Sequence, residues 1–585
     1  MSHRKKIFDL TEQAPGLCRI LPSFLIKGLE NLLGFSEFNR GHDAVEDEWE
    51  QGSTENFFAL ACKHLPLNYE LEGLDNIPKE GPVVIVSNHP HGMSDGLMFG
   101  DVALKARSDV KIIVNEWLNY VRGMRTYTIQ VDVYGGEKAK AANMRGMRES
   151  IKWLREGHCL LVFPSGSAAT FSPRDARVIE DPWQENMAAL IRKTGATVVP
   201  MNISGRTGIF FQVVSMVAKG MRAMFLPREI KRDIRTKHTI RLGKPITPTT
   251  ISQLPDNTAL GNYLRLSSCL LRYPLISTSV TNAPRDMQPI AEPEDPEVLQ
   301  AELDKCEEDI CYINERAGLT VYALTADKVP HMINEIGVQR EITFRAVGEG
   351  SGQPRDLDAY DTHYVQLIMW DSKNKRLAGA YRIGRTDDIM RRMGRKGIYN
   401  SLFFHLRHQF TNAVDNGLEM GRAFITAPYQ RAAASLDTLW MGIGRFINKH
   451  PEYRYLYGNV TVSQDYTPAA RSLMLSYLRA HAMDEKLKKY VIAYEPPPAL
   501  EIGLRSQDRR LVPSALCDLS LMNTMVCALE PDGKGIPVLL RQYLRLGGKM
   551  VSFNFDPEFG NTLDCLVLVD MANAPERIMK RYRGL

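Results

Sequence analysis

The sequence contains no run of about 18 uninterrupted apolar residues, the length that a membrane-spanning helix needs. Its most apolar stretch, residues 208–226, is interrupted by Lys219 and Arg222. The N-terminal sequence MSHRKKIFDLTEQAPG lacks the apolar segment of a signal peptide, and residues 17–35 have an amphipathic pattern instead. We therefore expect contact with a membrane to be peripheral.

Paired cysteines and a strong excess of charge are also missing. The nine cysteines include no CxxC pair, which favours a reducing cytosol. Lys and Arg number 73 against 68 Asp and Glu, and the resulting net charge of +5 is too small to indicate a nucleic-acid partner. The cations nevertheless cluster at Arg222, Arg228, Lys231, Arg232, Arg235, Lys237, Arg241 and Lys244. This cluster is either a docking surface for anionic lipid or an acidic carrier protein, or a solvated face beside a buried helix.

The length and one change in composition predict the domain organisation. A chain of 585 residues is too long for one hydrophobic core, and it shows no internal repeat. Residues 278–300 are rich in Pro, Asp and Glu, which marks a linker. We predict a membrane-associating amphipathic segment at 1–60, a first folded domain at 61–280, a linker at 281–297 and a second domain at 298–585.

The first domain alternates strand-like and helical segments. PVVIVSN (82–88), CLLVFPS (159–165) and TVVPMNISG (197–205) are short apolar runs that end in turn residues. Residues 140–157, between the first two runs, have helical spacing. This order predicts an α/β fold with functional residues where the strands end.

Two histidines and an aspartate follow the first of these strands, in SNHPHGMSDG (87–96). His89, His91 and Asp95 are candidate metal ligands, but no HExxH motif, cysteine cluster or further close histidine completes a metal site. A structural turn is a second interpretation. The third is catalytic, because a histidine at a strand end can take a proton from an alcohol that attacks an acyl thioester when a carboxylate fixes its tautomer. His89 as base and Asp95 as its partner meet this requirement.

Four sequence blocks place these residues in a wider pattern: SNHPHGMSDG (87–96), VDVYGGEKAKAANM (131–144), LLVFPSGSAA (160–169) and VVPMNISGRTG (198–208). Their order and spacing resemble those of the glycerolipid acyltransferase family over about residues 60–250. The resemblance implies that His89 and Asp95 form a catalytic dyad and that the third and fourth blocks shape the acceptor and acyl pockets. The candidate substrate-binding residues are Asn88, Phe163, Pro164, Ser165 and Gly166.

Two departures from the family pattern bear on the base and the acceptor. Five residues rather than four separate His89 from Asp95, as in the branch that acylates lyso-ornithine lipids and often bears the label hemolysin. His91 is therefore a rival base, although Asn88 and His89 match the family's opening pair. The third block reads FPSG, with Ser165 where the family usually has Glu, and the next arginine is Arg174. The absence of this glutamate and of a nearby arginine favours an acceptor without phosphate.

The second domain combines mixed strands with a helix. Alternating residues predict a hairpin around residues 371–375, RAFITA (422–427) predicts a further strand, and residues 432–447 have helical spacing. These elements suit an α+β fold of the acetyltransferase (GNAT) type. Gln430 and Arg431 lie between the strand and the helix, where backbone N–H groups can bind the phosphate of a phosphopantetheine arm. The spacing allows a merely capped helix equally well.

Charged residues carry a closer likeness, in the order Asp356, Asp358, Asp361, Arg382, Glu419 and Arg422. They resemble the autoinducer-synthase branch of the acetyltransferase superfamily and, more closely, the ornithine acyl-carrier-protein N-acyltransferases, over about residues 300–585. The resemblance implies that Glu419 is the base, that the aspartates orient the amine and that the arginines hold them or the acceptor carboxylate. Glu419 and Arg422 reach one site only if their strand bulges. A salt-bridge network that organises the sheet is the alternative.

The two domains together resemble the bifunctional ornithine lipid synthases. The resemblance implies that the second domain N-acylates ornithine with a 3-hydroxyacyl group and that the first O-acylates the new hydroxyl. Acyl carrier protein is the expected donor and partner, without a metal or another cofactor, at the inner face of a bacterial cytoplasmic membrane. Glycine, lysine and glutamine remain open as head groups. The alternatives are a glycerolipid acyltransferase with an accessory GNAT domain and a membrane-lytic protein, although no export signal or long lytic segment is evident.

Overall fold

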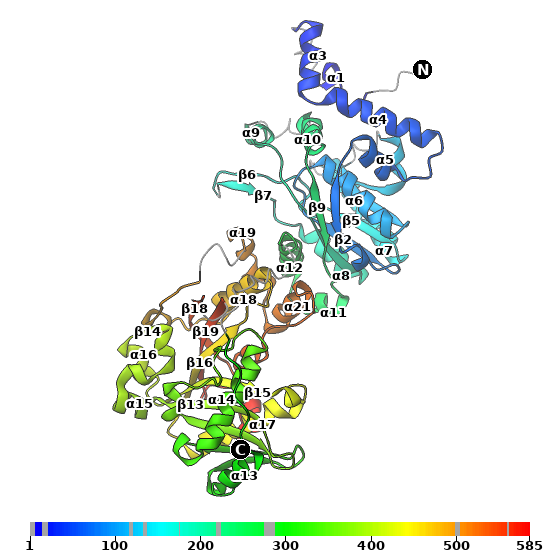
Figure 1. Cartoon of the computed structure of the whole chain (residues 1–585). Coiled ribbons are helices and arrows are strands. Elements are labelled where there is room, and N and C mark those ends of the chain that lie inside the picture. The colour runs from blue at the N-terminus through cyan, green and yellow to red at the C-terminus, as the bar shows by residue number, and fades with distance from the viewer. Residues whose placement is uncertain are drawn as a thin grey trace. The chain divides into compact units, whose positions relative to one another are not determined.

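The structure is a computed structural model that describes residues 6–13, 21–115, 121–132, 137–174, 176–217, 224–273, 287–497, 504–557 and 561–584. The chain divides into two compact units, drawn in Figure 1. Unit 1 consists of Met1–Pro274 and Arg505–Leu529, and unit 2 of Leu275–Leu504 and Glu530–Leu585. The chain thus leaves unit 1 after residue 274, returns to it at residues 505–529 and finishes in unit 2. The single boundary expected at residue 298 does not include this return.

The expected linker, residues 281–297, lies partly outside the described residues. From residue 287 onward it belongs to unit 2, because the N–H of Gln288 donates to the carbonyl of Gly352 at 2.9 Å. The N–H of Ala291 likewise donates to the carbonyl of Pro354 at 3.0 Å. These backbone bonds fix the described part of the segment against unit 2.

Unit 1 contains a seven-stranded sheet in the order β1-β9-β8-β2-β5-β3-β4, parallel except between β8 and β9. Its strands are β1 (Tyr69–Glu72), β2 (Val83–Ser87), β3 (Val110–Asn115), β4 (Thr128–Val131), β5 (Cys159–Val162), β8 (Thr197–Ile203) and β9 (His238–Leu242). A separate hairpin joins β6 (Thr170–Ser172) to β7 (Arg177–Ile179). β2 and β5 are buried throughout, which explains their continuous apolar runs. The three predicted strands lie side by side as β5, β2 and β8, so the α/β prediction is confirmed.

The helices of unit 1 are α1 (Leu10–Gln13), α3 (Ser23–Leu32), α4 (Phe35–Glu50), α5 (Phe57–His64), α6 (Met93–Ala106), α7 (Glu137–Arg155), α8 (Glu185–Thr194), α9 (Ile209–Val217), α10 (Leu226–Asp233), α11 (Pro248–Ser252) and α12 (Asn257–Leu270). α6 and α7 are the connections that return the chain to parallel strands, and α7 confirms the helix predicted at 140–157. Within the described ranges, no helix is both long and apolar enough to cross a bilayer.

The returning segment adds α19 (Ser506–Arg509), α20 (Val512–Ala515) and α21 (Leu519–Leu529) to unit 1. Polar contacts fix it in place: Arg272 lies 3.0 Å from the Asp508 carboxylate, and the Asn262 amide donates to the Ser514 hydroxyl at 3.0 Å. The inner side chains of α21, among them Met525, are buried. This segment is therefore part of the unit 1 core.

Unit 2 contains an eight-stranded sheet in the order β10-β11-β12-β13-β15-β16-β19-β18. Its strands are β10 (Ile310–Asn314), β11 (Leu319–Leu324), β12 (Val365–Asp371), β13 (Arg376–Arg385), β15 (Gly417–Ile425), β16 (Tyr455–Val462), β18 (Lys549–Asp556) and β19 (Thr562–Asp570). β14 (Phe404–Leu406) and β17 (Val491–Ala493) pair separately. The predicted hairpin is the antiparallel pair β12 and β13, and the predicted strand at 422–427 lies largely within β15.

The helices of unit 2 are α13 (Pro296–Leu303), α14 (Pro330–Arg345), α15 (Thr386–Met393), α16 (His408–Ala413), α17 (Ala433–Lys449), α18 (Pro468–His481), α22 (Val538–Arg545) and α23 (Glu576–Arg583). Met332 and Ile336 of α14 share a core with Ile368 and Trp370 of β12. α17 confirms the helix predicted at 432–447, and the mixture of strands and helices confirms the α+β prediction.

Two neighbouring strands of this sheet part half-way along their length. β15 and β16 pair in parallel from Gly417 with Tyr455 to Glu419 with Tyr457. Beyond that point β16 continues beside β19, and β15 continues beside β13. Beyond Glu419 and Tyr457, β15 and β16 are therefore no longer joined by backbone pairing.

Candidate active sites

The first candidate site lies where the central strands of unit 1 end. His89 follows β2, Phe163 follows β5 and Ser204 follows β8. Because these three strands are parallel and adjacent, their carboxyl ends meet at one edge of the sheet. The sequence blocks that are far apart along the chain are thereby brought together.

His89 and Asp95 form a hydrogen-bonded pair at this edge. Nδ1 of His89 lies 2.9 Å from Oδ2 of Asp95, which also accepts the backbone N–H groups of His91 and Gly92 at 2.7 and 2.9 Å. Asp95 is fully buried in the first turn of α6. Burial opposes its charge, but the hydrogen bond from His89 and the charge on His91 outweigh burial and lower the pKa of the Asp95 carboxyl.

An apolar cavity of about 250 Å³ lies beside His89. The ring of Phe163 stacks on the imidazole with centroids 4.1 Å apart, and both residues line the cavity. Other lining side chains are aliphatic or aromatic, including Phe57, Leu97 and Val121. When Nδ1 of His89 donates to Asp95, Nε2 is the nitrogen that can accept a proton. The arrangement places a base beside a space suited to an acyl chain.

His91 has a different environment and does not line this cavity. Its Nε2 donates to the carbonyl of Ser204 at 2.9 Å, and its Nδ1 lies 3.0 Å from Oδ1 of Asp233. Both neighbours are oxygen acceptors and Asp233 is an anion, so these surroundings favour the protonated imidazolium form of His91. Burial lowers its pKa, but Asp233 and Asp95 raise it to about 9. A ring held in its charged form has no lone pair for a proton, so the geometry favours His89 over its rival.

The remaining predicted residues of this site differ in what they can contact. The Asn88 amide donates to the carbonyl of Ile203 at 2.9 Å and accepts its N–H at 2.7 Å. These two bonds join β2 to β8 and fix the position of Asn88, whose binding role stays a prediction. Gly166 lines the cavity, and its positive φ of 69° favours glycine. Pro164 and Ser165 lie between it and Phe163 and are buried.

The second candidate site begins with an irregularity in β15. Ala380 pairs with Phe424 and Arg382 pairs with Gly421, so Arg422 and Ala423 together face one residue of β13. Arg422 has a φ of +51°, which is unusual for a residue with a side chain. This bulge turns Arg422 toward the side of the sheet that carries Arg382 and Glu419. The sequence predicted that Glu419 and Arg422 reach one site only if their strand bulges, and β15 has such a bulge.

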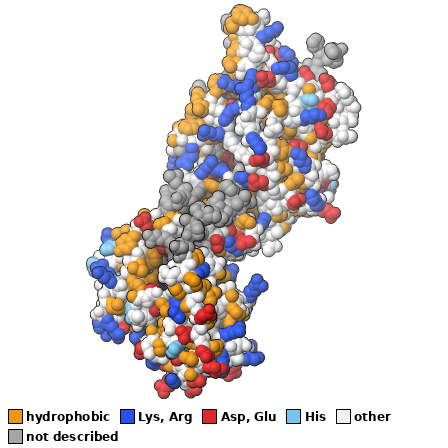
Figure 2. All heavy atoms as spheres, in the orientation of Figure 1, with side chains coloured by type: hydrophobic (Ala, Val, Ile, Leu, Met, Phe, Trp, Pro, Cys, Tyr) orange, Lys and Arg blue, Asp and Glu red, His pale blue; other side chains and the backbone are white. Residues whose placement is uncertain are grey.

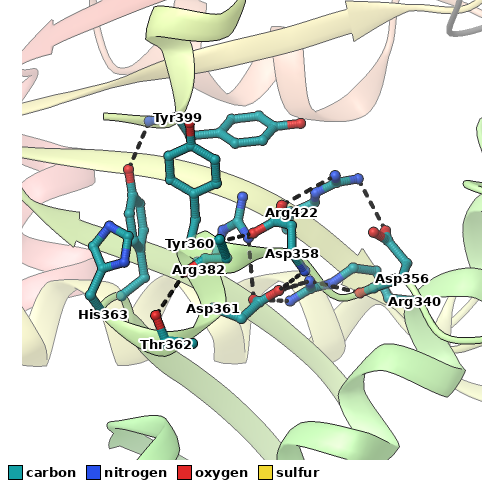
Figure 3. Close-up of polar contacts among 12 residues, drawn as sticks. Arg340, Asp356, Asp358, Tyr360, Asp361, Thr362, His363, Arg382, Tyr399 and Arg422 are labelled. Carbon is teal, nitrogen blue, oxygen red and sulfur yellow. Dashed lines mark hydrogen bonds and ion pairs between the residues drawn. The ribbon is translucent and has the colours of Figure 1, made fainter. Parts of the chain in front are cut away.

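Three arginines and three aspartates alternate beside this bulge, as Figure 3 shows. Arg340 contacts Asp361 at 3.2 Å, Arg382 contacts Asp358 at 2.6 Å and Asp361 at 3.2 Å, and Arg422 contacts Asp356 at 3.0 Å and Asp358 at 3.5 Å. The guanidinium of Arg382 also lies 4.8 Å from the ring centre of Tyr399. All three aspartates predicted to hold the acceptor are therefore already paired with arginines.

Glu419 is buried and surrounded by donors. Its carboxylate accepts the hydroxyl of Tyr364, the N–H of Tyr399 at 3.0 Å, and the N–H and side-chain amide of Asn400 at 2.7 and 2.5 Å. Burial raises the pKa of Glu419, and these hydrogen bonds oppose that effect. With four donors on two oxygens and 1% of the residue exposed, Glu419 holds the segment around residue 400 against the sheet.

Gln430 and Arg431 lie apart from this network, in the turn before α17. The Gln430 amide donates to the carbonyl of Ile425 at 2.9 Å, and Arg431 is exposed. The N-cap residue Ala432 makes no side-chain hydrogen bond to the helix. The N–H of Ser435 in the first turn donates to the carbonyl of Ala432 at 3.0 Å, and the phosphate site expected before α17 stays a prediction.

Two family models match the chain. An acyltransferase model matches residues 8–271, and an acetyltransferase (GNAT) domain model matches residues 339–441. The glycine N(alpha)-acyltransferase of Bacteroides thetaiotaomicron is 30% identical over 302 residues, which are 48% of this chain and 86% of that protein. The chain therefore belongs to the same family as this N-acyltransferase.

Two further likenesses were found for the acyltransferase. The lyso-glycine lipid O-acyltransferase of the same organism is 25% identical over 264 residues, 44% of this chain and 93% of that protein. The crystal structure of the 1-acyl-sn-glycerophosphate acyltransferase PlsC from Thermotoga maritima is 19% identical, covers 43% of this chain and 84% of its own, and has a TM-score of 0.24. The acyltransferase thus has relatives named for amino-acid N-acylation and for lysolipid O-acylation.

Two residues of the first site in the acyltransferase were missed in the sequence. Asp233 lies far from the four blocks, and no local pattern links it to His91. Glu180 accepts the N–H of His89 at 3.0 Å, and its carboxylate also interacts with Ser165. Burial raises the pKa of Glu180, against the charge of Arg265 and the hydrogen bond with Ser165. Glu180 thus places a carboxylate beside Ser165, the position at which the family usually has a glutamate.

Proposed function

We propose that this acyltransferase is an aminolipid synthase that carries out two successive acylations. Unit 2 transfers a 3-hydroxyacyl group from acyl carrier protein to the amine of an amino acid. Unit 1 then transfers a second acyl group to the hydroxyl of that product. The order of reaction is the reverse of the order of the units along the chain.

One observation carries this proposal: two acyltransferase models match separate ranges of one chain, and its relatives are named for the two complementary reactions. An N-acylated amino acid that bears a hydroxyl is the product of the first reaction type and the acceptor of the second. In unit 1, His89 takes the proton of the hydroxyl through Nε2 while Asp95 stabilises the imidazolium. The cavity beside His89 receives the acyl chain.

The head group that we propose is ornithine, which the sequence resemblance implies. Glycine is the second candidate, because it appears in the names of the relatives at 30% and 25% identity. The absence of Glu and Arg from the FPSG block supports an acceptor without phosphate in either case.

We also propose that unit 1 binds the inner face of the cytoplasmic membrane. In α9, Ile209, Phe210, Val213 and Met216 are exposed by 82%, 42%, 47% and 43%, whereas Phe211 of the same helix is buried and lines the cavity. α3 has no buried residue. Figure 2 shows hydrophobic side chains along α3 at the top of the view, with Lys and Arg side chains near them. An apolar surface beside the cations of α10 fits an anionic bilayer.

Purified full-length protein, 3-hydroxyacyl carrier protein and either ornithine or glycine provide the test, with lipid products identified by mass spectrometry. We expect an N-acylated product first and a diacylated product after a second acyl carrier protein is added. Ornithine should be used at least tenfold more efficiently than glycine. Acylation of 1-acylglycerol-3-phosphate without any aminolipid product would replace this proposal with a glycerolipid acyltransferase.

A further inference from the structure

Two carboxylates near the second site have no cation as partner. Asp356, Asp358 and Asp361 are paired with arginines, whereas Glu349 and Asp564 form no ion pair within 4 Å among the described residues. Only 6% of Asp564 is exposed, and its Oδ2 has no hydrogen-bond partner in the part of the chain that the structure describes. A buried carboxylate oxygen without a donor is costly, unless a ligand supplies one.

The strand register places Asp564 just beyond the divergence of β15 and β16. Asp564 of β19 pairs with Thr461 of β16, four residues past Tyr457, the last residue of β16 that pairs with β15. It shares its side of β19 with Leu566 and Leu568, which pack with Tyr457 and Tyr364 in one core. Glu419 contacts Tyr364, so Asp564 and Glu419 face the same side of the sheet.

Electrostatic effects join Asp564 to the arginine network. Glu349, in the loop after α14, is affected by the charge of Arg422, and Asp564 is affected by the charge of Glu349. Arg422 pairs with Asp356, and its Nε has no hydrogen-bond partner among the described residues. Arg422 thus offers a free donor, and Asp564 a free acceptor oxygen, on the side of the sheet that carries Glu419, with Glu349 close enough to influence the pKa of Asp564. This distribution of charge complements an amino acid, which carries one carboxylate and one amine.

Both carboxyl groups lose their protons at neutral to slightly alkaline pH, so both are available as carboxylates above about pH 8. Burial raises the pKa of Asp564 to about 8, with further effects from Asp556 and Glu349 and an opposing hydrogen bond from Asn554. Burial and the charge of Asp465 raise the pKa of Glu349 to about 7, against the effect of Arg422. A general base works best when its pKa lies near the pH of the reaction, and Glu419, with its four donors, lacks a free oxygen for that task.

We propose that Asp564 and Glu349 bind the amine of the amino-acid acceptor and that Asp564 is the base of the N-acylation, an inference that rests on the function proposed above. Arg422 binds the carboxylate of the acceptor. Asp564 accepts a proton from the ammonium, and the freed nitrogen attacks the thioester carbon. A C–N bond forms and the C–S bond breaks, the thiolate takes the second proton of the nitrogen, and Asp564 releases its own proton to solvent.

Replacement of Asp564 provides the test, in the full chain. D564N should lower kcat for N-acylation by about 100-fold or more while KM for the amino acid changes only a few-fold. The rise of kcat with pH that ends near pH 8 in the wild type should disappear. D564E keeps the carboxylate and should recover part of the rate. E349Q should mainly raise KM for the amino acid.

Two controls separate this inference from loss of folding and from failure of the proposed function. D570N, on the same strand but in an exposed pair with Arg454, should keep wild-type N-acylation. O-acylation of a supplied lyso-lipid by D564N should also equal that of the wild type. A D564N variant with wild-type kcat and pH profile would overturn the inference alone. A wild-type chain that N-acylates no amino acid would overturn the proposed function and this inference together.

Discussion

Nδ1 of His89 lies 2.9 Å from Oδ2 of Asp95, in a pair that is formed between the end of a strand and the first turn of the helix that follows it. Because Asp95 also accepts two backbone N–H groups, its position does not depend on His89. The histidine is therefore the member of the pair whose removal tests the chemistry with least disturbance of the fold.

Replacement of His89 by Ala should stop the second acylation. We expect turnover with a lyso-lipid to fall about 100-fold or more, since the general base is lost, and mono-acylated lipid to accumulate. Mass spectrometry of the lipid products measures both effects. H158A is a matched control, because His158 precedes β5 and thus lies at the other end of the strand from Phe163. Normal amounts of diacyl lipid from H89A would contradict the assignment.

The pair of His91 and Asp233 should make the stability of unit 1 depend on pH. The pKa of His91 is raised from 6.5 to about 9, so the stabilisation is complete below pH 6.5 and is lost as the pH rises through 9. The shift corresponds to about 3 kcal/mol. In thermal unfolding at pH 6 and pH 9.5, D233N should be much less stable than the wild type at pH 6 and close to it at pH 9.5. A difference that is the same at both values would refute a charged His91.

Replacement of Glu419 by Gln should affect stability more than chemistry. The amide would place donors opposite four existing donors, which costs about 2 kcal/mol or more in the free energy of unfolding. Chemical denaturation measures this loss. The remaining folded protein should keep the dependence of N-acylation on pH. Disappearance of that dependence in E419Q, with D564N unchanged, would return the role of base to Glu419.

The apolar surface of α9 should carry membrane binding. Ile209→Ser combined with Val213→Ser removes two exposed apolar side chains without touching the buried Phe211. We expect at least a tenfold loss of binding to anionic vesicles in a sedimentation assay. Val538→Ser, at an exposed position of unit 2, is the control. Equal binding of the double variant and the wild type would exclude α9 as the contact.

Unit 1 without its returning segment should be unstable. A fragment of residues 1–280 lacks α21, whose Met525 and Leu529 lie beside Tyr263 and Leu270 around one small cavity. We expect the fragment to unfold at a lower temperature than unit 1 in the full chain or to aggregate. Addition of a peptide of residues 504–530 should restore part of the stability. A fragment as stable as the full chain would show that the segment is dispensable.

The parts of the fold that the sequence predicted are those with local signals. The buried runs of β2, β5 and β8 and the turn between β12 and β13 each have a pattern within ten residues. The return of residues 505–529 to unit 1 has no such signal, because it depends on contacts with α12 across more than two hundred residues. Tertiary contacts of this kind leave no periodic pattern in the sequence.

The difference between local patterns and distant contacts also explains which parts of the candidate sites could be predicted. The spacing of His89 and Asp95 is short, so their pairing could be inferred from sequence. The charged state of His91 depends on Asp233, which is distant in the chain. In unit 2 the sequence predicted that Arg382 and Arg422 hold the aspartates or the acceptor carboxylate, with a salt-bridge network as the alternative, but it did not identify Arg340, which pairs with Asp361.

The path of the chain has a genetic consequence. A stop codon placed between residues 497 and 505 would remove β18 and β19 from unit 2 and, with the same cut, the segment that completes unit 1. Division of the gene at residue 280 would likewise leave the first product without helices encoded by the second. A C-terminal truncation between residues 497 and 505 would therefore damage both units at once.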